Sequence, residues 1–582
     1  MHVVATAGHV DHGKSTLVEA LTGMQPDRLA DEQRRGLSIE LGYCWTRLDD
    51  VGDVAFVDVP GHERFVTTML AGVGPVPVAM LVVAADDPWM PQAAEHLAAL
   101  DALGVRHGLL VVTRADLTDP TPALDRARSE LAATSLRDAP AVVVSGRTGR
   151  GLSELRATLT HVLRAMPAPD PAADVRLWVD RRFHVRGAGT VVTGTLPAGT
   201  IRAGDTLSFD GRPVRVRGVE SLGVPVASAS GVARVALDLG GKAPEHLRRG
   251  SVLVTPDAYE SADVVDVRLL GEGRVPERPV LHVGATSMGV RARPLDDDLV
   301  RLTLPQALPL RIGDRALLRD PGSRHLWGVR VLDPVAPPLP RRRGAAAGRA
   351  KDLASVDGSV AAEVERRGLV RASLLRRLGA SGAPPSGGFA SGDWLVSGAQ
   401  VRAWRSSVAA LLTETSTGAR PSVPVAQVSR ALGLPDEALL AEQLPSGWRL
   451  DSGSVSPASS SLPARLAAAL QSLGPRLRSA PFDAPSVDDL RSLGLSSSDL
   501  ALLARGGHLL RVADNIVLLP GADELAVSLL AQLPQPFTTS EARTALGTSR
   551  RVVLPLLAYL DKTGRTVRLP DDRRRLRTSA AS

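Results

Sequence analysis

Residues 3–16 read VVATAGHVDHGKST. An apolar run leads into a glycine-rich loop, and a helical pattern follows, so the order is strand, loop, helix. The loop has the spacing G-x-x-x-x-G-K-S, which binds phosphate groups through backbone N–H groups and through the positive end of a helix. Lys14 is placed to reach the β- and γ-phosphates of a nucleotide, and the Ser15 hydroxyl to bind Mg²⁺. The residues expected to contact the nucleotide here are Gly8, His9, Val10, Asp11, His12, Gly13, Lys14, Ser15 and Thr16.

Lysine is rare in this chain, which makes the lysine of the loop informative. Only four of the 69 basic residues are lysines, and Lys14 is one of them. A compact, flexible ammonium group reaches a phosphate in places where the planar guanidinium fork does not fit. Lys14 therefore indicates a phosphate contact rather than a surface charge.

Length and composition predict a soluble, cytoplasmic protein of about four domains. The chain has 582 residues and one cysteine, Cys44, which excludes an intramolecular disulfide and fits a reducing compartment. No apolar run reaches the roughly 18 residues that span a bilayer, and we expect neither a signal peptide nor membrane contact. The net charge is +7, and nearly all of the surplus lies in residues 541–582, so an acidic partner is expected at that end.

The pattern of elements divides the chain into five parts. Residues 1–168 alternate short apolar strands with helical segments, which is typical of a parallel sheet with helices on both faces. Residues 173–258 and 259–333 have the short alternating segments and glycine turns of two β-barrels. Residues 334–350 read as a linker, and 351–582 fit four winged-helix units, the last at about 521–582. The predicted fold class is therefore multidomain: an α/β P-loop domain, two β-barrels, and tandem α+β winged-helix units.

A second motif follows the predicted strand at residues 54–58. Asp58 can hold Mg²⁺ through water, and the Gly61 N–H can meet the γ-phosphate, so this turn would respond to hydrolysis. His62 comes next and is placed to orient the attacking water, which makes it the candidate catalytic residue. Ser38, in the loop after the first helix, carries a hydroxyl that can close on the same ion. The expected metal ligands are Ser15, Ser38 and Asp58.

The base is expected to lie against the ends of two later strands. Thr113, Arg114 and Asp116 follow one strand, and the Asp116 carboxylate can accept both N–H donors of guanine. Adenine offers no matching pair of donors, so a carboxylate here favours GTP and GDP. Ser145 and Gly146 follow the next strand and are expected to contact the guanine O6 atom. In this order, the motifs predict a GTPase.

The runs GHVDHGKSTL at 8–17 and DVPGH at 58–62 resemble those of the translational GTPases of the elongation factor Tu type. Within that group the chain is similar to the SelB family, the selenocysteine-specific elongation factors, through the runs at 34–43, 69–74, 180–183 and 187–195. The resemblance covers residues 1–340 and returns in GTSRR at 547–551. It implies a GTPase domain, two barrels that help to hold aminoacyl-tRNA, and winged helices that bind an mRNA hairpin beside a UGA codon.

By the same resemblance, Asp180, Arg181 and Arg234 match positions that line the aminoacyl pocket. A selenol is largely ionised at neutral pH, so two arginines would favour a selenolate over the neutral side chain of serine. Two positions depart from the family pattern: Ser38 stands where threonine is usual, and Arg114 where lysine is usual. Neither departure removes a group that the function requires.

Residues 537–577 read as one winged helix with a basic surface. Arginines at a helix N-terminus and on a β-hairpin suit the phosphates and splayed bases of an RNA hairpin. Aromatic stacking groups are scarce in this segment, so binding should be mainly electrostatic and sensitive to salt. The residues expected to contact RNA are Arg550, Arg551, Arg568, Arg573, Arg574 and Arg575.

Together these features predict a carrier that delivers selenocysteinyl-tRNA to the ribosomal A site at UGA codons marked by an mRNA hairpin (SECIS). Its cofactors would be GTP, GDP and Mg²⁺, its partners the tRNA, the hairpin and the ribosome, and its state a monomer. The alternative is a general aminoacyl-tRNA carrier or an initiation-type translational GTPase, which would not need a basic four-unit extension. A helix-turn-helix regulator with a nucleotide switch would bind duplex DNA and would have no use for two barrels.

Overall fold

The computed structural model describes the chain except for residues 27–37, 39, 63–64, 75, 88, 186–188, 242–243, 341, 417–422, 445–447, 452, 458–463 and 578–582. The chain forms two compact units, residues 1–407 and residues 408–582. In the part of the chain that is described, no helix combines the length and the apolar character that crossing a membrane requires.

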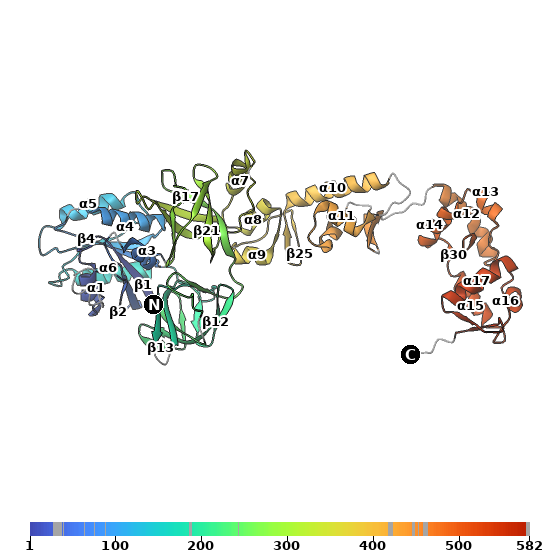
Figure 1. The fold of residues 1–582 in the computed structure, drawn as a ribbon, viewed down its shortest axis with the longest axis horizontal. Coiled ribbons are helices and arrows are strands. Elements are labelled where there is room, and N and C mark those ends of the chain that lie inside the picture. The colour runs from blue at the N-terminus through green and yellow to red at the C-terminus, as the bar shows by residue number, and fades with distance from the viewer. Residues whose placement is uncertain are drawn as a thin grey trace. The chain divides into compact units, whose positions relative to one another are not determined.

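The N-terminal part of the first unit is a six-stranded sheet with helices on both faces, as the sequence predicts (Figure 1). Its elements are β1 His2–Ala7, α1 Lys14–Thr22, β2 Gly42–Leu48, β3 Gly52–Asp58, α3 Val66–Val73, β4 Val78–Ala84, α4 Pro91–Ala102, β5 His107–Thr113, α5 Thr121–Leu131, β6 Ala141–Val143 and α6 Leu152–Arg164. The strand order is β2-β3-β1-β4-β5-β6, in which only β2 is antiparallel to its neighbour.

Alternate residues of these strands face opposite helical layers. On β1, Val3 and Ala5 belong to the core that includes residues of α3, α4 and α5, whereas Val4 belongs to the core that includes residues of α1 and α6. A strand buried on both faces reads as a continuous apolar run, which explains why these segments were visible in the sequence. The carboxyl ends of the parallel strands meet at one edge of the sheet, and the loops there carry the predicted site.

Two barrel-like β-domains follow, each with its own core. The strands of the first are β7 Arg176–Trp178, β8 Arg181–Val185, β9 Gly189–Leu196, β10 Thr200–Arg202, β11 Thr206–Phe209, β12 Arg212–Ser221, β13 Val224–Val226, β14 Ser228–Ser230, β15 Ala233–Leu239 and β16 Val252–Val254. Those of the second are β17 Ser261–Leu270, β18 Val280–Val283, β19 Thr286–Gly289, β20 Arg291–Pro294, β21 Leu299–Pro309, β22 Arg315–Arg319 and β23 Leu326–Asp333. On β15 every second residue is buried, the alternation that predicted an all-β region.

Part of the predicted linker at 334–350 is helical. Helix α7, Ala345–Leu353, begins inside that segment, and α8, Val360–Arg367, follows it. The Asp333 carboxylate, at the end of β23, accepts hydrogen bonds from Arg349 of α7 at 2.5 Å and from two residues of α8, Arg366 at 2.8 Å and Arg367 at 2.7 Å. This segment is therefore attached to the second barrel by buried ion pairs and does not act as a free tether.

The ion pairs extend into a larger buried group. Arg349 also donates to Asp266 on β17 at 2.7 Å, and Asp266 accepts from Arg301 on β21 at the same distance. Glu363 of α8 accepts from Arg366 and Arg367. We call these seven residues the charge cluster: Asp266, Arg301, Asp333, Arg349, Glu363, Arg366 and Arg367. Its three carboxylates are fully buried, and the side chains of its four arginines are largely buried with them.

After β23, the described helices and strands group into four units, each with one small sheet. The elements of the first two are α7, α8, β24 Leu369–Arg371, α9 Ala372–Arg377, β25 Phe389–Ser391 and β26 Trp394–Val396, then α10 Gly398–Ser416, β27 Val423–Pro424, α11 Val425–Leu432, the 3-10 helix η2 Glu437–Gln443, β28 Trp448–Asp451 and β29 Ser454–Pro457. The last two contain α12 Ala464–Ser479, α13 Val487–Ser492, α14 Ser497–Arg505, β30 Leu510–Ala513 and β31 Ile516–Leu518, then α15 Ala522–Leu530, α16 Thr539–Ala545, α17 Arg550–Lys562, β32 Thr566–Arg568 and β33 Arg574–Leu576.

The last two units share one hydrophobic core. Phe482 and Ala484 of the third unit pack in the same cluster as Val553 and Leu557 of α17. The Thr548 hydroxyl also donates to the carbonyl oxygen of Phe482 at 2.5 Å. These two units therefore form a single folded body rather than two separate modules.

Candidate functional site

The loop between β1 and α1 turns where side chains do not fit. Gly8 has φ = 133°, and a Cβ atom there would lie 2.2 Å from the carbonyl oxygen of Val82 on β4. Gly13 has φ = 78° and immediately precedes α1. L residues rarely adopt such angles, so both positions require glycine. The turn ends at the N-terminus of α1, whose first residues line a pocket.

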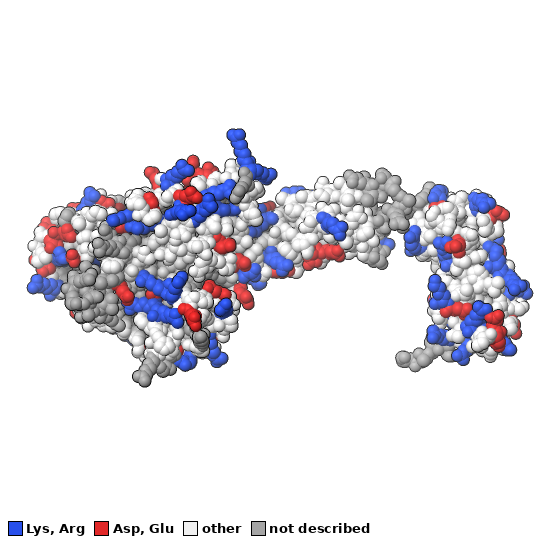
Figure 2. All heavy atoms as spheres, viewed as in Figure 1, with Lys and Arg blue, Asp and Glu red and all other residues white. Residues whose placement is uncertain are grey.

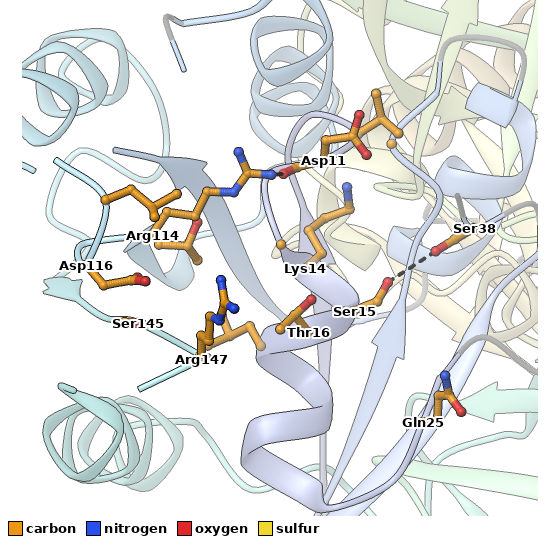
Figure 3. Close-up of a pocket in the computed structure, with 17 residues that line it drawn as sticks. Asp11, Lys14, Ser15, Thr16, Gln25, Ser38, Arg114, Asp116, Ser145 and Arg147 are labelled. Atoms are coloured by element: carbon orange, nitrogen blue, oxygen red, sulfur yellow. Dashed lines mark hydrogen bonds between the residues drawn. The ribbon is translucent and has the colours of Figure 1, made fainter. Parts of the chain in front are cut away.

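This pocket has a volume of about 630 Å³ and lies at the edge of the sheet that the sequence indicated. Figure 3 shows Asp116 at one end, Ser38 at the other, and Lys14 between them. The lining residues are Val10, Asp11, Gly13, Lys14, Ser15, Thr16, Leu17, Gln25, Ser38, Gly61, Thr113, Arg114, Asp116, Leu117, Ser145, Gly146 and Arg147. Segments that are far apart in the sequence thus converge on one cavity of a size that suits a small ligand.

The Lys14 side chain is folded against the loop that carries it. Its Nζ atom donates to the carbonyl oxygen of Gly8 at 3.1 Å and to that of His9 at 2.6 Å. The residue is 6% exposed. A buried ammonium group that donates to carbonyl oxygens of the loop is well placed to bind an anion that enters the pocket.

Ser15 and Ser38 line the other end of the pocket, and the buried Asp58, which does not line it, contacts Ser15. The Ser15 Oγ atom donates to Asp58 Oδ2 at 2.6 Å and lies 3.2 Å from the Ser38 Oγ atom. Thr6 donates to Asp58 Oδ1 at 2.7 Å and fixes the carboxylate from behind. Two hydroxyls and one carboxylate are hard oxygen donors, and Mg²⁺ in nucleotide sites is typically held by such a set together with phosphate oxygens. Of the loop 35–39, only Ser38 lies among the described residues.

Gly61 packs directly on the glycine-rich loop. A Cβ atom on it would lie 2.4 Å from the backbone nitrogen of Val10 and 2.6 Å from Lys14 Nζ. His62 follows, but it does not line the pocket, and the centre of its ring lies 5.9 Å from that of Phe65. The structure thus brings His62 close to the site through its neighbour Gly61 and directs its ring towards α3.

The far end of the pocket carries a carboxylate. The Ser145 hydroxyl donates to Asp116, which together with other hydrogen bonds lowers the pKa of this exposed carboxyl. Arg114 donates to Asp86 at 3.2 Å and to the carbonyl oxygen of Asp11, so its side chain lies along the pocket wall. Thr113 donates to the carbonyl oxygen of the loop residue His12 at 2.7 Å. An ionised carboxylate beside these side chains can accept two N–H donors of a flat base.

Two histidines of the loop lie behind it rather than in the pocket. His12 is fully buried, with Nδ1 3.3 Å from the carbonyl oxygen of Val82 and Nε2 3.1 Å from Asp87. The ring centre of His9 lies 5.0 Å from that of His12. We predicted nucleotide contact for both residues, and in the structure neither lines the pocket. A third buried histidine, His96 of α4, which the sequence analysis did not single out, accepts a hydrogen bond from the Gly8 N–H at 3.0 Å.

Of the three barrel residues singled out by resemblance, Asp180 and Arg234 form a buried pair, and Arg181 is half-buried. Asp180 and Arg234 pair through two hydrogen bonds, one of them 2.7 Å long. Thr193 donates to Asp180 at 2.7 Å and accepts from Arg234 at 3.0 Å. Burial acts to raise the pKa of Asp180, but Arg234 and the hydrogen bonds outweigh it and hold that pKa below its ordinary value. Asp180 is therefore ionised and paired at neutral pH.

Tyr43, on β2 of the sheet domain, completes this arrangement. The Arg234 guanidinium lies over the Tyr43 ring at 3.8 Å, and that of Arg181 at 4.9 Å. Arg181 also pairs with Glu40 at 3.3 Å and donates to the carbonyl oxygen of Leu41. A pocket of about 230 Å³ is lined by Tyr43, Arg181 and Arg234 among others. The sequence analysis missed Tyr43, because nothing in a lone strand tyrosine shows that an arginine from position 234 will cover it.

The basic C-terminal side chains have two kinds of environment. Figure 2 shows basic side chains over the visible face of the last units, with acidic ones between them. Arg550 and Arg575 are exposed. Arg568 pairs with Asp572, and Arg573 pairs with Asp571 at 3.2 Å. These four arginines remain on the surface, where phosphates can reach them.

Arg574 and Arg551 instead hold the fold together. Arg574 is 6% exposed and donates to Asp561 of α17 at 2.9 Å, so it joins the β-hairpin to the helix. Arg551 donates to the carbonyl oxygens of Pro485 at 3.1 Å and of Ala484 in the preceding unit. The prediction of an RNA contact for Arg574 is corrected by its burial, and Arg551 is already used as a bridge between units.

Known proteins match this chain at both ends. The model of the elongation factor Tu GTP binding domain matches residues 1–165, and the elongation factor SelB winged helix matches residues 528–575. The selenocysteine-specific elongation factor of Escherichia coli (strain K12) is 38% identical over 341 residues, 57% of this chain and 55% of that protein. The chain thus spans about half the length of the selenocysteine-specific relatives that it matches.

Two further proteins, an initiation factor subunit and a solved structure, are similar to this chain. The translation initiation factor 2 subunit gamma of Halobacterium salinarum (strain ATCC 29341 / DSM 671 / R1) is 33% identical over 278 residues, 39% of this chain and 67% of that protein. A crystal structure of a bacterial selenocysteine-specific elongation factor, EF-Sec, is similar over 99% of this chain and 100% of that chain, with a TM-score of 0.73 and 26% identity. The chain therefore belongs to the translational GTPases of the elongation factor Tu type, and within them it is similar to the selenocysteine-specific elongation factors of the SelB type.

Proposed function

We propose that this chain binds selenocysteinyl-tRNA and delivers it to the ribosomal A site at UGA codons that an mRNA hairpin marks, with ribosome-stimulated hydrolysis of GTP to GDP and phosphate. The observation that carries the proposal is the presence in one chain of an elongation factor Tu GTP-binding domain at 1–165 and a SelB winged helix at 528–575. A nucleotide switch and an RNA-binding fold at opposite ends suit a carrier that reads a message before it releases its cargo.

In the nucleotide site, the chemistry of each side chain indicates the part of the nucleotide that it would bind. Lys14 exchanges its carbonyl partners for the β- and γ-phosphates, and Asp116 accepts the two N–H donors of guanine. Ser15, Ser38 and Asp58 would hold Mg²⁺, which would neutralise phosphate charge. The Ser15 hydroxyl oxygen already lies 3.2 Å from that of Ser38 and 2.6 Å from the Asp58 carboxylate.

His62 is the proposed catalytic residue. It lies one position after Gly61, whose backbone packs against Val10 and Lys14. A γ-phosphate bound at Gly61 would therefore bring the attacking water within reach of the His62 side chain. Because the His62 ring packs near Phe65, catalysis requires the ring to rotate towards the pocket, and we assign that rotation to contact with the ribosome.

The aminoacyl end of the tRNA is proposed to bind beside Asp180, Arg181 and Arg234. Arg234 is fixed by Asp180 and by the Tyr43 ring, so its guanidinium is held in place before a ligand arrives. A selenolate gains charge-assisted hydrogen bonds from fixed arginines, whereas a serine hydroxyl gains only neutral ones. A difference of about 4 kcal/mol between the two gives roughly thousandfold discrimination.

The mRNA hairpin is proposed to contact the exposed arginines of the last unit. Arg550 lies at the N-terminus of α17, where helix N–H groups add to the attraction for phosphate. Arg568, Arg573 and Arg575 lie on the β32–β33 hairpin and the turn that joins its strands. With one winged helix carrying most of the charge surplus, hairpin affinity should fall steeply as salt rises.

The initiation-type alternative is supported by the 33% identity to a translation initiation factor 2 subunit gamma. That similarity covers 39% of this chain, and an initiation-type function would not explain the presence of the winged-helix units. An initiation-type factor would carry one fixed aminoacyl-tRNA and would not discriminate through a charged side-chain pocket.

Protection of the ester bond tests the proposal and separates it from the alternative. Purified protein with GTP is mixed with selenocysteinyl-tRNA, or with the same tRNA carrying serine, and spontaneous deacylation is followed over time. We expect strong protection of the selenocysteinyl form alone, and loss of that selectivity in Arg234→Met. Arg217→Met is the matched control, because Arg217 lies on the same barrel in an exposed pair with Asp238. Equal protection of both aminoacyl forms would overturn the selenocysteine assignment and leave a translational GTPase.

A further inference from the structure

His96 lies behind the glycine-rich loop, outside the nucleotide pocket. It belongs to α4, 88 residues away from Gly8 in the sequence, and is 2% exposed. Its Nδ1 atom accepts the backbone N–H of Gly8 at 3.0 Å. This is a buried contact between a helix that carries no motif and the first residue of the loop.

The Gly8 N–H needs such an acceptor because the sheet ends just before it. The pairing of β1 with β4 reaches Ala7 opposite Leu81 and stops there. Gly8 then turns with φ = 133° so close to Val82 that no side chain fits, and it does not line the pocket. A buried N–H without a partner is costly, so the loop can hold this turn only if an acceptor meets it. His96 supplies the acceptor.

The contact also sets the protonation state of the ring. Nδ1 can accept only when it carries no proton, so the neutral ring holds its proton on Nε2. Burial, with Lys14 and His9 nearby, lowers the pKa of His96 to about 3. On the other side of Gly8, Lys14 donates to its carbonyl oxygen at 3.1 Å. Both polar backbone groups of Gly8 are therefore held from two directions.

The helix that carries His96 is itself fixed by the second barrel. Glu95, the preceding residue, accepts a hydrogen bond from Arg319 of β22 at 3.4 Å. The backbone of Gly328 on β23 also lies against Ala102 at the end of α4. The position of the imidazole thus depends on two neighbouring domains and not on the loop alone.

We propose that His96 is a positioning residue of the nucleotide site, which holds Gly8 so that the loop has its phosphate-binding shape before a nucleotide arrives. The inference rests on the proposed binding of GTP and GDP at this loop. Without the acceptor, the free protein relaxes the turn to expose the Gly8 N–H to water, and each binding event must restore it. Nucleotide affinity then falls although no group that touches the nucleotide has changed.

Three variants of His96 separate hydrogen bonding from packing. His96→Leu fills space but accepts nothing. His96→Asn is smaller, but its side-chain oxygen takes the place of Nδ1. His96→Gln carries its oxygen one bond further, towards the place of Nε2. His161→Leu is the matched control, because His161 is an exposed histidine on α6. Affinity for fluorescently labelled GDP and GTP is measured on the full chain, with a thermal melt of each free variant.

We expect His96→Leu and His96→Gln to weaken both nucleotides by about tenfold or more, and His96→Asn to bind within about threefold of the unchanged chain. If His96→Leu binds as tightly as the unchanged chain, the inference is wrong. It is equally wrong if Asn weakens binding as much as Leu, because packing would then explain both. Should His96→Leu not fold, Asn against Gln decides between the same two outcomes. Failure of the unchanged chain and of His161→Leu to bind GTP would instead refute the proposed function.

Discussion

Replacing Asp333 by asparagine removes one charge from the middle of the charge cluster and keeps the shape of the side chain. Asp333 is fully buried and accepts from Arg349, Arg366 and Arg367 at 2.5 to 2.8 Å, and from the Val335 N–H at 3.0 Å. In the variant, the four arginines of the cluster face only two carboxylates, Asp266 and Glu363. Removing one partner from a buried ion pair typically costs about 3–5 kcal/mol.

That cost should fall on the attachment of α7 and α8 to the second barrel. Hydrogen exchange of the backbone amides at residues 345–367 measures it, because these amides are protected only while the helices are docked. We expect Asp333→Asn to accelerate their exchange by more than about a hundredfold, the equivalent of about 3 kcal/mol. Asp352→Asn, on an exposed position of α7, is the matched control and should change exchange little. Equal exchange in the two variants would refute the argument that the cluster holds this joint.

The effect of pH gives a second check with a definite sign. Burial acts to raise the pKa of Asp333, but Arg367, Arg366 and Arg349 outweigh it and hold the pKa below its ordinary value. A carboxyl whose pKa is depressed by folding stabilises the protein above its unfolded pKa of about 3.9, and that contribution is lost as the pH falls through the folded value. The difference between Asp333→Asn and the unchanged chain should therefore be largest near neutral pH and shrink below about pH 4. A difference that grows on acidification would contradict the assigned charge state.

Four other variants test the proposed sites. Lys14→Ala should lose GTP and GDP binding, measured by fluorescence titration, because it removes the ammonium group that is placed to bind the phosphates. Tight binding would exclude the phosphate role. Asp116→Asn should shift preference from GTP towards XTP in a competition assay, and an unchanged preference would place guanine recognition elsewhere. Arg550→Ala should weaken binding to an RNA hairpin and reduce the slope of log affinity against log salt concentration by about one. Arg574→Ala should instead lower the melting temperature of the last unit. The reverse pattern would contradict the assignment of Arg550 to the surface and of Arg574 to the interior.

The glycine-rich loop and the position of the pocket beside it were predictable because a phosphate-binding loop demands particular residues at fixed spacing. A phosphate loop needs glycine at positions 8 and 13, and the observed φ values of 133° and 78° explain why. The alternation of apolar segments likewise revealed the buried strands and the two barrels. In both cases the determining interactions are local, or repeat with the period of the element.

What sequence reasoning missed depends on contacts between distant segments. His96 and Tyr43 lie on ordinary elements, and only the fold brings them to Gly8 and Arg234. Composition was misleading at 334–350, where arginine, alanine and proline suggested a linker. Composition does not show that Arg349 forms buried ion pairs with Asp266 and Asp333 of the second barrel. The same cause explains Arg574, which reads as a surface charge and is buried against Asp561.

Because Tyr43 comes from the sheet domain, the small cavity beside Arg234 has walls from two domains. A chimera that carries only the first barrel onto another GTPase would keep Asp180 and Thr193 with their hydrogen bonds, but it would uncover one face of the guanidinium. The proposed selectivity for a charged side chain should then change although every barrel residue had been transferred. Both domains are thus needed to form this cavity, and grafting experiments should transfer residues 1–254 together.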